Sequence, residues 1–170
     1  MKIRIASEND IPTLTRIVNQ TWKVAYKDIV SEKDIELYTN NETRAEKFGK
    51  LFTDEKAVVL ICEYENSLCG MISATSCDIK NFSECAYIIQ FYVLPDFQNK
   101  GVGHALMNSM LSLLRDSGYQ HVLLDTLEKN HNARGFYEKL GFKFCGAKAS
   151  SFFEHGIMCI DYIKELNTDE

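Results

Sequence analysis

The sequence predicts an α/β fold built around a mixed β-sheet. Segments rich in β-branched and aromatic residues alternate along the chain with segments whose apolar residues recur every three or four positions. Residues Ala86–Leu94 are mostly apolar at both even and odd positions, so both faces of a strand here would be apolar, which indicates a central strand covered on both faces. The chain has 170 residues, the usual length of one domain, and we expect a single domain over residues 1–170.

The first half of the chain is expected to form a strand, a long helix, two short helices and a hairpin. Lys2–Ala6 alternates polar and apolar residues and predicts the first strand. Ser7 and Asp10 form an acidic variant of the capping box, and apolar residues recur at helical spacing over residues 8–26. Two shorter helices are expected over Ser31–Tyr38 and Thr43–Leu51, followed by hairpin strands over Val58–Glu63 and Leu68–Ser73.

The second half alternates helices and strands. After the central strand, Gly103–Ser117 carries Leu106, Met110 and Leu114 on one helical face, and Gly118 marks the end of that helix. The remaining elements are a strand over His121–Leu127, a helix over Asn132–Leu140 and a closing strand pair over Phe142–Cys145 and Ile157–Lys164. The acidic tail, residues 167–170, is expected to fray.

Composition and charge narrow the classes of partner. The 19 Lys and Arg residues against 24 Asp and Glu residues give a formal net charge of −5. Nucleic-acid binders normally carry an excess of basic residues, so we expect no nucleic-acid partner, whereas a cationic substrate fits this charge. No stretch reaches the roughly 20 apolar residues of a membrane-spanning helix, and the N-terminus lacks the apolar core of a secretory signal. We therefore expect no membrane partner and a cytoplasmic location.

Cysteine and histidine spacing indicates neither a redox motif nor a metal site. The six cysteines contain no C-x-x-C pair, and we interpret them as reduced, buried small apolar residues. His104, His121 and His131 show no mutual spacing typical of metal ligands, so we expect no metal.

A glycine-rich turn, residues 98–103 (Q-N-K-G-V-G), connects the central strand to the following helix. Such a turn presents unpaired backbone N–H groups at the positive end of the helix dipole, where an anion is favoured, and Lys100 adds a positive charge. Two familiar phosphate motifs are excluded, because Leu106 stands where the dinucleotide fingerprint needs glycine and no G-K-[ST] follows. On this segment alone, a phosphate cradle and a plain strand-to-helix turn both remain open.

A second segment, residues 130–142 (N-H-N-A-R-G-F-Y-E-K-L-G-F), follows the next strand. Together with the glycine-rich turn, it makes the sequence resemble the GNAT superfamily of acyl-CoA-dependent N-acetyltransferases. The first family motif, Q/R-x-x-G-x-G/A, is matched by Gln98, Gly101 and Gly103. The second, N-x-x-A-x-x-F-Y-x-x-x-G-F, is matched by Asn130, Ala133, Phe136, Tyr137, Gly141 and Phe142. The resemblance extends over nearly the whole chain.

The resemblance implies a GNAT fold, with a mixed sheet of about seven strands, flanked by about four helices and splayed between the fourth and fifth strands. Acetyl-CoA is then expected in the splay as co-substrate. Its pantetheine arm would lie along the central strand and its pyrophosphate on the glycine-rich turn. The residues implied in this binding are Phe91, Tyr92, Val93, Gln98, Asn99, Lys100, Gly101, Val102, Gly103, His104, Asn130 and Tyr137.

Acetyl transfer needs a proton donor for the leaving thiolate, a hydrogen-bond donor that stabilises the oxyanion, and a proton acceptor for the amine. The resemblance implies Tyr137 as the acid, since a phenol of pKa about 10 can protonate the thiolate of a thiol of pKa about 8.5. A core aromatic role is the alternative for Tyr137. A backbone N–H near Val93 is expected to donate the hydrogen bond that stabilises the oxyanion.

The proton acceptor and the acceptor pocket are less defined by the sequence. Tyr87 stands where many relatives carry Glu, so the base is unassigned, with ordered water as one alternative. Candidate bases are Glu84, Asp125, Glu128, Glu154 and His155. The residues expected around the acceptor are Trp22, Tyr26, Glu84, Tyr87, Asp125 and Phe153.

The function implied by the resemblance is direct transfer of an acetyl group from acetyl-CoA to a primary amine through a ternary complex. On charge grounds the acceptor is expected to be a small molecule, either a polyamine or another amine metabolite. Two alternatives stay open: a non-catalytic acyl-CoA sensor, which the missing strand carboxylate allows, and acetylation of a protein N-terminus or lysine. The sequence also leaves a homodimer open.

Overall fold

The computed structural model describes residues 1–79, 82–150, 153 and 156–166. The strands are β1 (Lys2–Ile5), β2 (Val58–Tyr64), β3 (Ser67–Ile79), β4 (Phe82–Val93), β5 (His121–Leu127), β6 (Lys143–Ala149) and β7 (Met158–Glu165). The helices are α1 (Ile11–Ala25), α2 (Glu32–Tyr38), α3 (Asn41–Phe52), α4 (Val102–Asp116) and α5 (His131–Lys139), with short 3-10 helices η1 (Glu8–Asp10) and η2 (Pro95–Phe97). Within the described ranges, no helix combines the length and apolar composition that crossing a membrane requires.

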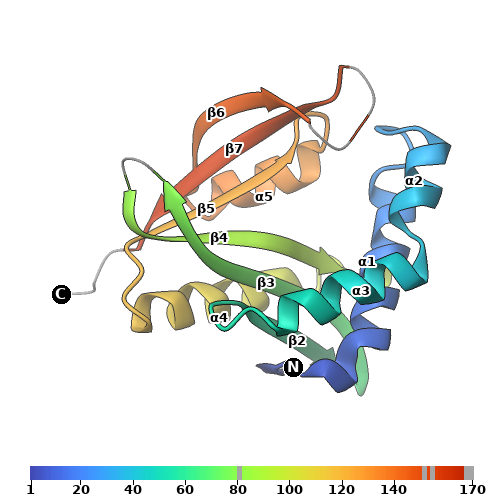
Figure 1. Cartoon of the computed structure of the whole chain (residues 1–170), viewed down its shortest axis with the longest axis horizontal. Coiled ribbons are helices and arrows are strands. Elements are labelled where there is room, and N and C mark those ends of the chain that lie inside the picture. The colour runs from blue at the N-terminus through green and yellow to red at the C-terminus, as the bar shows by residue number, and fades with distance from the viewer. Residues whose placement is uncertain (80–81, 151–152, 154–155, 167–170) are drawn as a thin grey trace.

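The strands form one mixed sheet in the order β1-β2-β3-β4-β5-β7-β6 (Figure 1), which confirms the predicted fold class. All neighbours are antiparallel except β4 and β5, whose parallel pairing ends at Ile88 and Leu124. Beyond that point β4 stays paired with β3 as far as Val93, and β5 stays paired with β7 as far as Leu127. The two strands therefore diverge, and the predicted splay between the fourth and fifth strands is confirmed.

The element boundaries differ from the predicted ones mainly in the β3–β4 hairpin. The strand expected over Leu68–Ser73 continues to Ile79, and its partner begins at Phe82 rather than Ala86. The reason is that the ladder continues beyond Ser76 and Ala86 through the pairs Cys77 with Cys85 and Ile79 with Phe82. The described part of the chain has five α-helices, as the residue patterns predict, against the about four that the resemblance implies. The predicted fraying of the tail concerns residues 167–170, which lie outside the described residues.

The core lies between the sheet and the apolar faces of α1 and α4, which both pack on β3 and β4. Leu14 and Ile17 of α1 and Leu106 and Met110 of α4 are fully buried. Gly70 on β3 permits the close approach of α4, since a Cβ there would lie 2.9 Å from the Leu106 side chain. This packing holds the N-terminus of α4 beside β4.

The cysteines are free thiols, as expected, and most are buried. Burial raises the pKa of Cys62 to about 11 and that of Cys85 to about 12, so neither thiol is reactive near neutral pH. Cys77 is half-buried, and the expectation of burial is wrong for Cys145, which is exposed because β6 is the outermost strand of the sheet.

The predicted acidic capping box forms at the first helical turn. The Ser7 N–H donates to Asp10 Oδ2 at 2.8 Å, and the Arg4 guanidinium contacts the same carboxylate at 2.7 Å. The Arg4 hydrogen bonds contribute most to lowering the pKa of Asp10, which falls to about 2. A carboxyl whose pKa is lowered on folding stabilises the fold above its unfolded-state pKa. That contribution is lost as the pH falls toward the folded-state value.

Asp10→Asn is therefore expected to lower the free energy of unfolding by about 1–2 kcal/mol at neutral pH. The deficit should shrink between about pH 4 and pH 2, where the wild-type carboxyl becomes protonated as well. Urea titrations at a series of pH values measure both effects. Glu8→Gln, at an exposed position of the same turn, should leave the free energy of unfolding unchanged. A deficit for Asp10→Asn that does not vary with pH would contradict the electrostatic explanation.

Candidate active site

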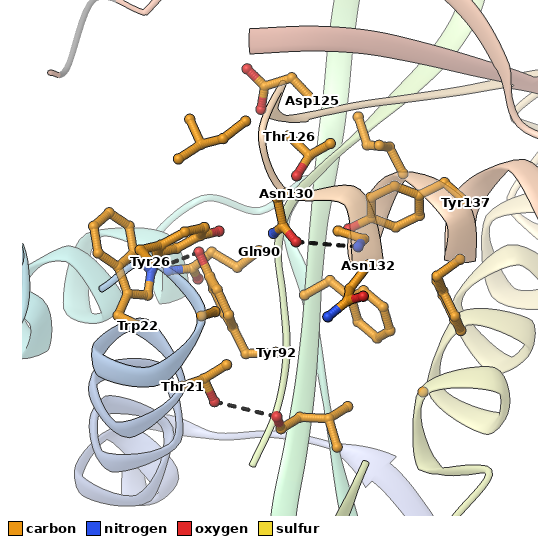
Figure 2. A pocket seen from close by; sticks show the side chains of 18 of the residues that line it. Thr21, Trp22, Tyr26, Gln90, Tyr92, Asp125, Thr126, Asn130, Asn132 and Tyr137 are labelled. Atoms are coloured by element: carbon orange, nitrogen blue, oxygen red, sulfur yellow. Dashed lines mark hydrogen bonds between the residues drawn. The ribbon is translucent and has the colours of Figure 1, made fainter. Parts of the chain in front are cut away.

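The divergence of β4 and β5 opens into a cleft of about 1260 Å³. The ends of these two strands form its walls, and the rest of its lining comes from α1, α2, α3, α5, the turn before α4 and the segment around the start of β7. Figure 2 shows Trp22, Tyr26 and Tyr92 on one side of the cleft and Asp125, Asn130 and Tyr137 on the other. The volume is larger than that of a typical small-molecule pocket, so the cleft has room for two ligands together.

The end of β4 turns backbone groups toward the cleft. The Leu94 N–H donates to the Cys69 carbonyl of β3 at 2.8 Å, and backbone groups of successive residues point to opposite sides of a strand. Phe91 and Val93 therefore direct their backbone groups away from β3, into the gap that β5 leaves. The Val93 carbonyl accepts a hydrogen bond from Gln98 Nε2 at 3.0 Å, which replaces the missing strand partner. The N–H groups on this side of β4 face the cleft.

The glycine-rich turn forms the N-terminus of α4 at the edge of the cleft. Gly101 caps the helix with a φ of +81°, a left-handed conformation that suits glycine. Gly101 has no side chain with which to cap this helix end, so it leaves the N–H groups of the first turn open to a ligand. A Cβ added at Gly103 would lie 3.4 Å from the Phe91 ring and 3.5 Å from the Phe136 ring, within the cleft wall. The turn thus has the features of an anion-binding site.

Most residues implied in cofactor binding line this cleft. They are Phe91, Tyr92, Val93, Gln98, Asn99, Gly101, Gly103, His104, Asn130 and Tyr137. Two do not line it: Lys100 places its ammonium 5.3 Å from the centre of the Phe97 ring, and Val102 is fully buried in the core. Aromatic faces attract the Lys100 cation away from the cleft, so a ligand at the turn would meet the backbone of these two residues.

Asn130 and Tyr137 are both held by α5. Asn130 Oδ1 accepts a hydrogen bond from the Ala133 N–H at 3.2 Å and so caps this helix, with the residue itself in the cleft wall (Figure 2). Tyr137 is buried, and burial, followed by the neighbouring Tyr92 and Asp125, raises its pKa above the ordinary value. A phenol that stays protonated inside a cleft can serve as a proton donor.

Aromatic side chains from α1, α2, β4 and the segment before β7 close one end of the cleft. We call this the aromatic end; it comprises Trp22, Tyr26, Tyr38, Tyr92 and Phe153. Trp22 Nε1 donates to Tyr92 Oη at 2.9 Å, and Tyr26 lies near the same phenol. The rings of Trp22 and Tyr26 pack edge to face at 4.7 Å, and burial raises the pKa of both Tyr26 and Tyr92. The predicted aromatic residues around the acceptor therefore lie together.

Asp125 lines the cleft where β5 leaves β4, one residue beyond the last parallel pair. Its carboxylate lies 3.6 Å from the Lys148 ammonium and near the Tyr87 phenol, whose pKa is raised by burial and then by this carboxylate. The side chain is 32% exposed. After burial, its negative charge is also among the causes that raise the pKa of Tyr26, Tyr92 and Tyr137, three of the tyrosines that line the cleft. Asp125 is thus placed to bind a cation or to accept a proton.

The other candidate bases are not brought to the cleft wall. Glu84 accepts a hydrogen bond from Gln120 Nε2 at the opposite end of β4, because the splay opens only after Ile88. Tyr87 contacts Asp125 without lining the cleft itself. Glu128 is exposed and also outside the lining, whereas Glu154 and His155 lie outside the described residues. Within the part of the chain that the structure describes, no group of His, Cys, Asp or Glu side chains is arranged to hold a metal ion.

Three residues of the aromatic region were missed by sequence reasoning: Tyr38, Arg44 and Lys47. The Arg44 guanidinium lies 5.4 Å from the centre of the Trp22 ring, and the Lys47 ammonium lies 5.5 Å from that of Tyr38. Their spacing of three residues on a helix puts both cations on one face, but no motif marks that face as functional. The contacts arise from tertiary packing of α3 against α1 and α2.

Together these groups suit acyl transfer from a thioester. An extended ligand can pair with the free edge of β4 and place an anion on the start of α4. Tyr137 can donate a proton to a leaving group, and Asp125 can receive one from a nucleophile.

Comparison with known proteins identifies the family. The profile of the acetyltransferase (GNAT) family matches residues 16–142, which is more than half of the chain. An uncharacterised N-acetyltransferase of Mycobacterium tuberculosis is 24% identical over 146 residues, covering 86% of this chain and 91% of that protein. A spermidine N(1)-acetyltransferase of Thermoplasma acidophilum is 24% identical over 156 residues, covering 89% of this chain and 94% of that protein.

Solved structures show that the fold is shared. The crystal structure of the PaiA N-acetyltransferase of Thermoplasma acidophilum in complex with coenzyme A matches with a TM-score of 0.77 at 21% identity, over 97% of this chain and 99% of that one. The ribosomal-protein-S18-alanine N-acetyltransferase of Escherichia coli gives a TM-score of 0.75 at 17% identity, over 99% and 96%. The chain therefore belongs to the acetyltransferase (GNAT) family and is an acetyl-CoA-dependent N-acetyltransferase.

Proposed function

We propose that this enzyme transfers the acetyl group of acetyl-CoA directly to the primary amine of a small molecule in the cytoplasm. The observation that carries the proposal is the divergence of β4 and β5. It opens a cleft whose lining includes the end of β4, Tyr137 and Asp125. The net charge of −5 favours a cationic amine, polyamine-like amines included, and so does the relationship to a spermidine acetyltransferase.

Acetyl-CoA would bind as an added strand. In this proposal its pantetheine arm pairs with the backbone of Phe91 in place of β5, and its thioester carbonyl reaches the Val93 N–H. Its pyrophosphate lies on the N–H groups at the start of α4, where Gly101 and Gly103 present no side chain. The unpaired edge of β4 and the uncapped end of α4 lie in the same cleft, which supports this placement.

The chemical steps follow from the groups around the splay. The acceptor ammonium first gives one proton to Asp125, directly or through water, and Asp125 passes it on to solvent. The neutral amine nitrogen then attacks the carbonyl carbon of the thioester, and its second proton leaves the tetrahedral intermediate by the same route. The Val93 N–H stabilises the negative charge that develops on the carbonyl oxygen. The C–S bond then breaks, and the CoA thiolate takes the phenolic proton of Tyr137, which solvent restores afterwards. The acetyl group passes directly to the amine, without a covalent enzyme intermediate.

Gly103→Leu is expected to raise the dissociation constant of acetyl-CoA by at least about tenfold, because the added side chain would occupy the cleft wall in front of Phe91 and Phe136. Calorimetric titration with acetyl-CoA measures the change. Gly49→Leu is the matched control, since Gly49 lies on α3 outside the cleft with no atom within 4 Å of an added Cβ. An unchanged dissociation constant for Gly103→Leu would argue against ligand binding at this turn.

An amine panel with thiol release as the readout tests the proposed function. Diamines, polyamines, aromatic amines, amino acids and short peptides are each offered with acetyl-CoA. We expect CoA release that depends on the presence of a small amine. Release with peptides alone would replace the small-molecule acceptor by a protein, and acetyl-CoA binding without any release would indicate a sensor.

A further inference from the structure

The aromatic end of the cleft contains a buried cation without a counter-charge. Arg44 lines the cleft and is only 6% exposed. Its Nη2 donates to the Tyr38 carbonyl, its guanidinium lies over the Trp22 ring, and its Nε has no hydrogen-bond partner. Within the described ranges, no carboxylate forms an ion pair with it.

The contacts within the chain compensate this charge only in part. Burial lowers the pKa of Arg44, which means that its neighbours stabilise the cation less than water would. The hydrogen bond to the Tyr38 carbonyl caps the end of α2 and gives one donor a structural role. Lys47 is exposed but lines the same cleft and brings a second cation to it, and Arg44 contributes, after desolvation, to lowering its pKa. An anionic ligand would offset the cost of burying Arg44 and reduce the repulsion between the two cations.

A negative charge, that of the Asp125 carboxylate, lines the same cleft as Tyr137, the proposed acid. After burial and Tyr92, the charge of Asp125 is a cause of the raised pKa of Tyr137. The cleft therefore carries a carboxylate on its β5 side, away from Trp22 in Figure 2, and the Arg44 cation at its aromatic end, against the Trp22 ring. An acceptor with positive charges at both ends would be repelled at Arg44, whereas an ammonium joined to a carboxylate matches both poles.

We infer that the acceptor amine also carries an anionic group, in the simplest case a carboxylate, which binds Arg44 while the amine faces Asp125. The inference rests on the proposed function and names its substrate class, an amino-acid-like zwitterion. A guanidinium binds a carboxylate through paired N–H donors, and Arg44 has donors beyond the one held by Tyr38. Arg44 is then the residue that determines acceptor specificity.

Matched acceptors that differ by one carboxylate test this inference. The pairs are ornithine with putrescine and lysine with cadaverine. For wild type, kcat/KM for each amino acid should exceed that for its decarboxylated partner by at least about tenfold. Arg44→Gln should reduce this preference to within about twofold, chiefly through the KM of the amino acid, and leave the dissociation constant of acetyl-CoA unchanged. A purely structural role for Arg44 would slow both members of a pair equally and leave the ratio intact, which would overturn the inference.

Two further comparisons keep the outcome decisive. Lys50→Gln removes an exposed charge from the same helix outside the cleft and should preserve the wild-type ratio. If Arg44→Gln does not fold, the wild-type ratios decide, and equal or better use of the diamines overturns the inference while the proposed function stands. Absence of CoA release with all four acceptors also overturns the inference, and the proposed function fails with it only if the wider amine panel gives no release.

Discussion

Tyr137→Phe is expected to lower the rate of acetyl transfer by about 10²–10³-fold while acetyl-CoA binding stays within about twofold of wild type. The Tyr137 ring packs against Phe91, Phe136 and Phe142 with centroid distances of 6.3, 5.8 and 5.9 Å, contacts that Phe preserves. The variant therefore removes the proton donor for the thiolate and little else. Since burial raises the pKa of Tyr137 above its ordinary value, kcat of wild type should not fall between about pH 7 and pH 9.

Single-turnover quench experiments measure this chemical step separately from product release. Tyr119→Phe, at a half-buried position outside the cleft, is the matched control and should react at the wild-type rate. If Tyr137→Phe also reacts at the wild-type rate in a single turnover, Tyr137 is not the acid.

Asp125→Asn is expected to lower kcat/KM by about 10²-fold near neutral pH, because the acceptor ammonium loses both its counter-charge and its proton acceptor. The amide has nearly the same shape as the carboxylate, so the divergence of β4 and β5 should persist. A primary ammonium has a pKa of about 10, and the deficit should shrink as the pH approaches that value, where the acceptor arrives deprotonated. The pH profile of kcat/KM for wild type and variant measures the effect.

The control for this variant is Asp161→Asn. Lys148 contacts Asp161 at 2.8 Å and Asp125 at 3.6 Å, but Asp161 does not line the cleft. Asp161→Asn should therefore leave kcat/KM nearly unchanged. Equal losses in the two variants, or a loss in Asp125→Asn that is constant with pH, would assign Asp125 to holding Lys148 rather than the amine.

Local backbone geometry explains why much of the fold and of the cofactor side of the cleft could be predicted. Gly101 occupies a left-handed helix cap, a conformation that favours glycine, so this residue type is expected there. Asn130 caps α5 and Tyr137 lies within it, so their spacing in the sequence fixes their relative positions in space. The end of β4 has apolar residues at both even and odd positions, which likewise indicates the central place that this strand has in the sheet.

The acceptor side depends on contacts between distant segments, and the sequence contains no local pattern for it. Asp125 faces the cleft and Glu84 does not, because the parallel register of β4 and β5 ends at Ile88 and Leu124. Arg44 reaches Trp22 only through the packing of α3 against α1. Register and helix packing are set by the whole core, so these residues could be located only in the folded chain.

The most direct test of the proposed chemistry is a single turnover of enzyme, acetyl-CoA and an acceptor from the amine panel, with all acetylated species quantified by mass spectrometry. Direct transfer predicts that acetylated amine and free CoA form at the same rate and in equal amounts, with no acetylated protein at any time. Acetyl-CoA that binds but stays intact in the presence of every amine, or an acetylated enzyme that precedes the product, would contradict it.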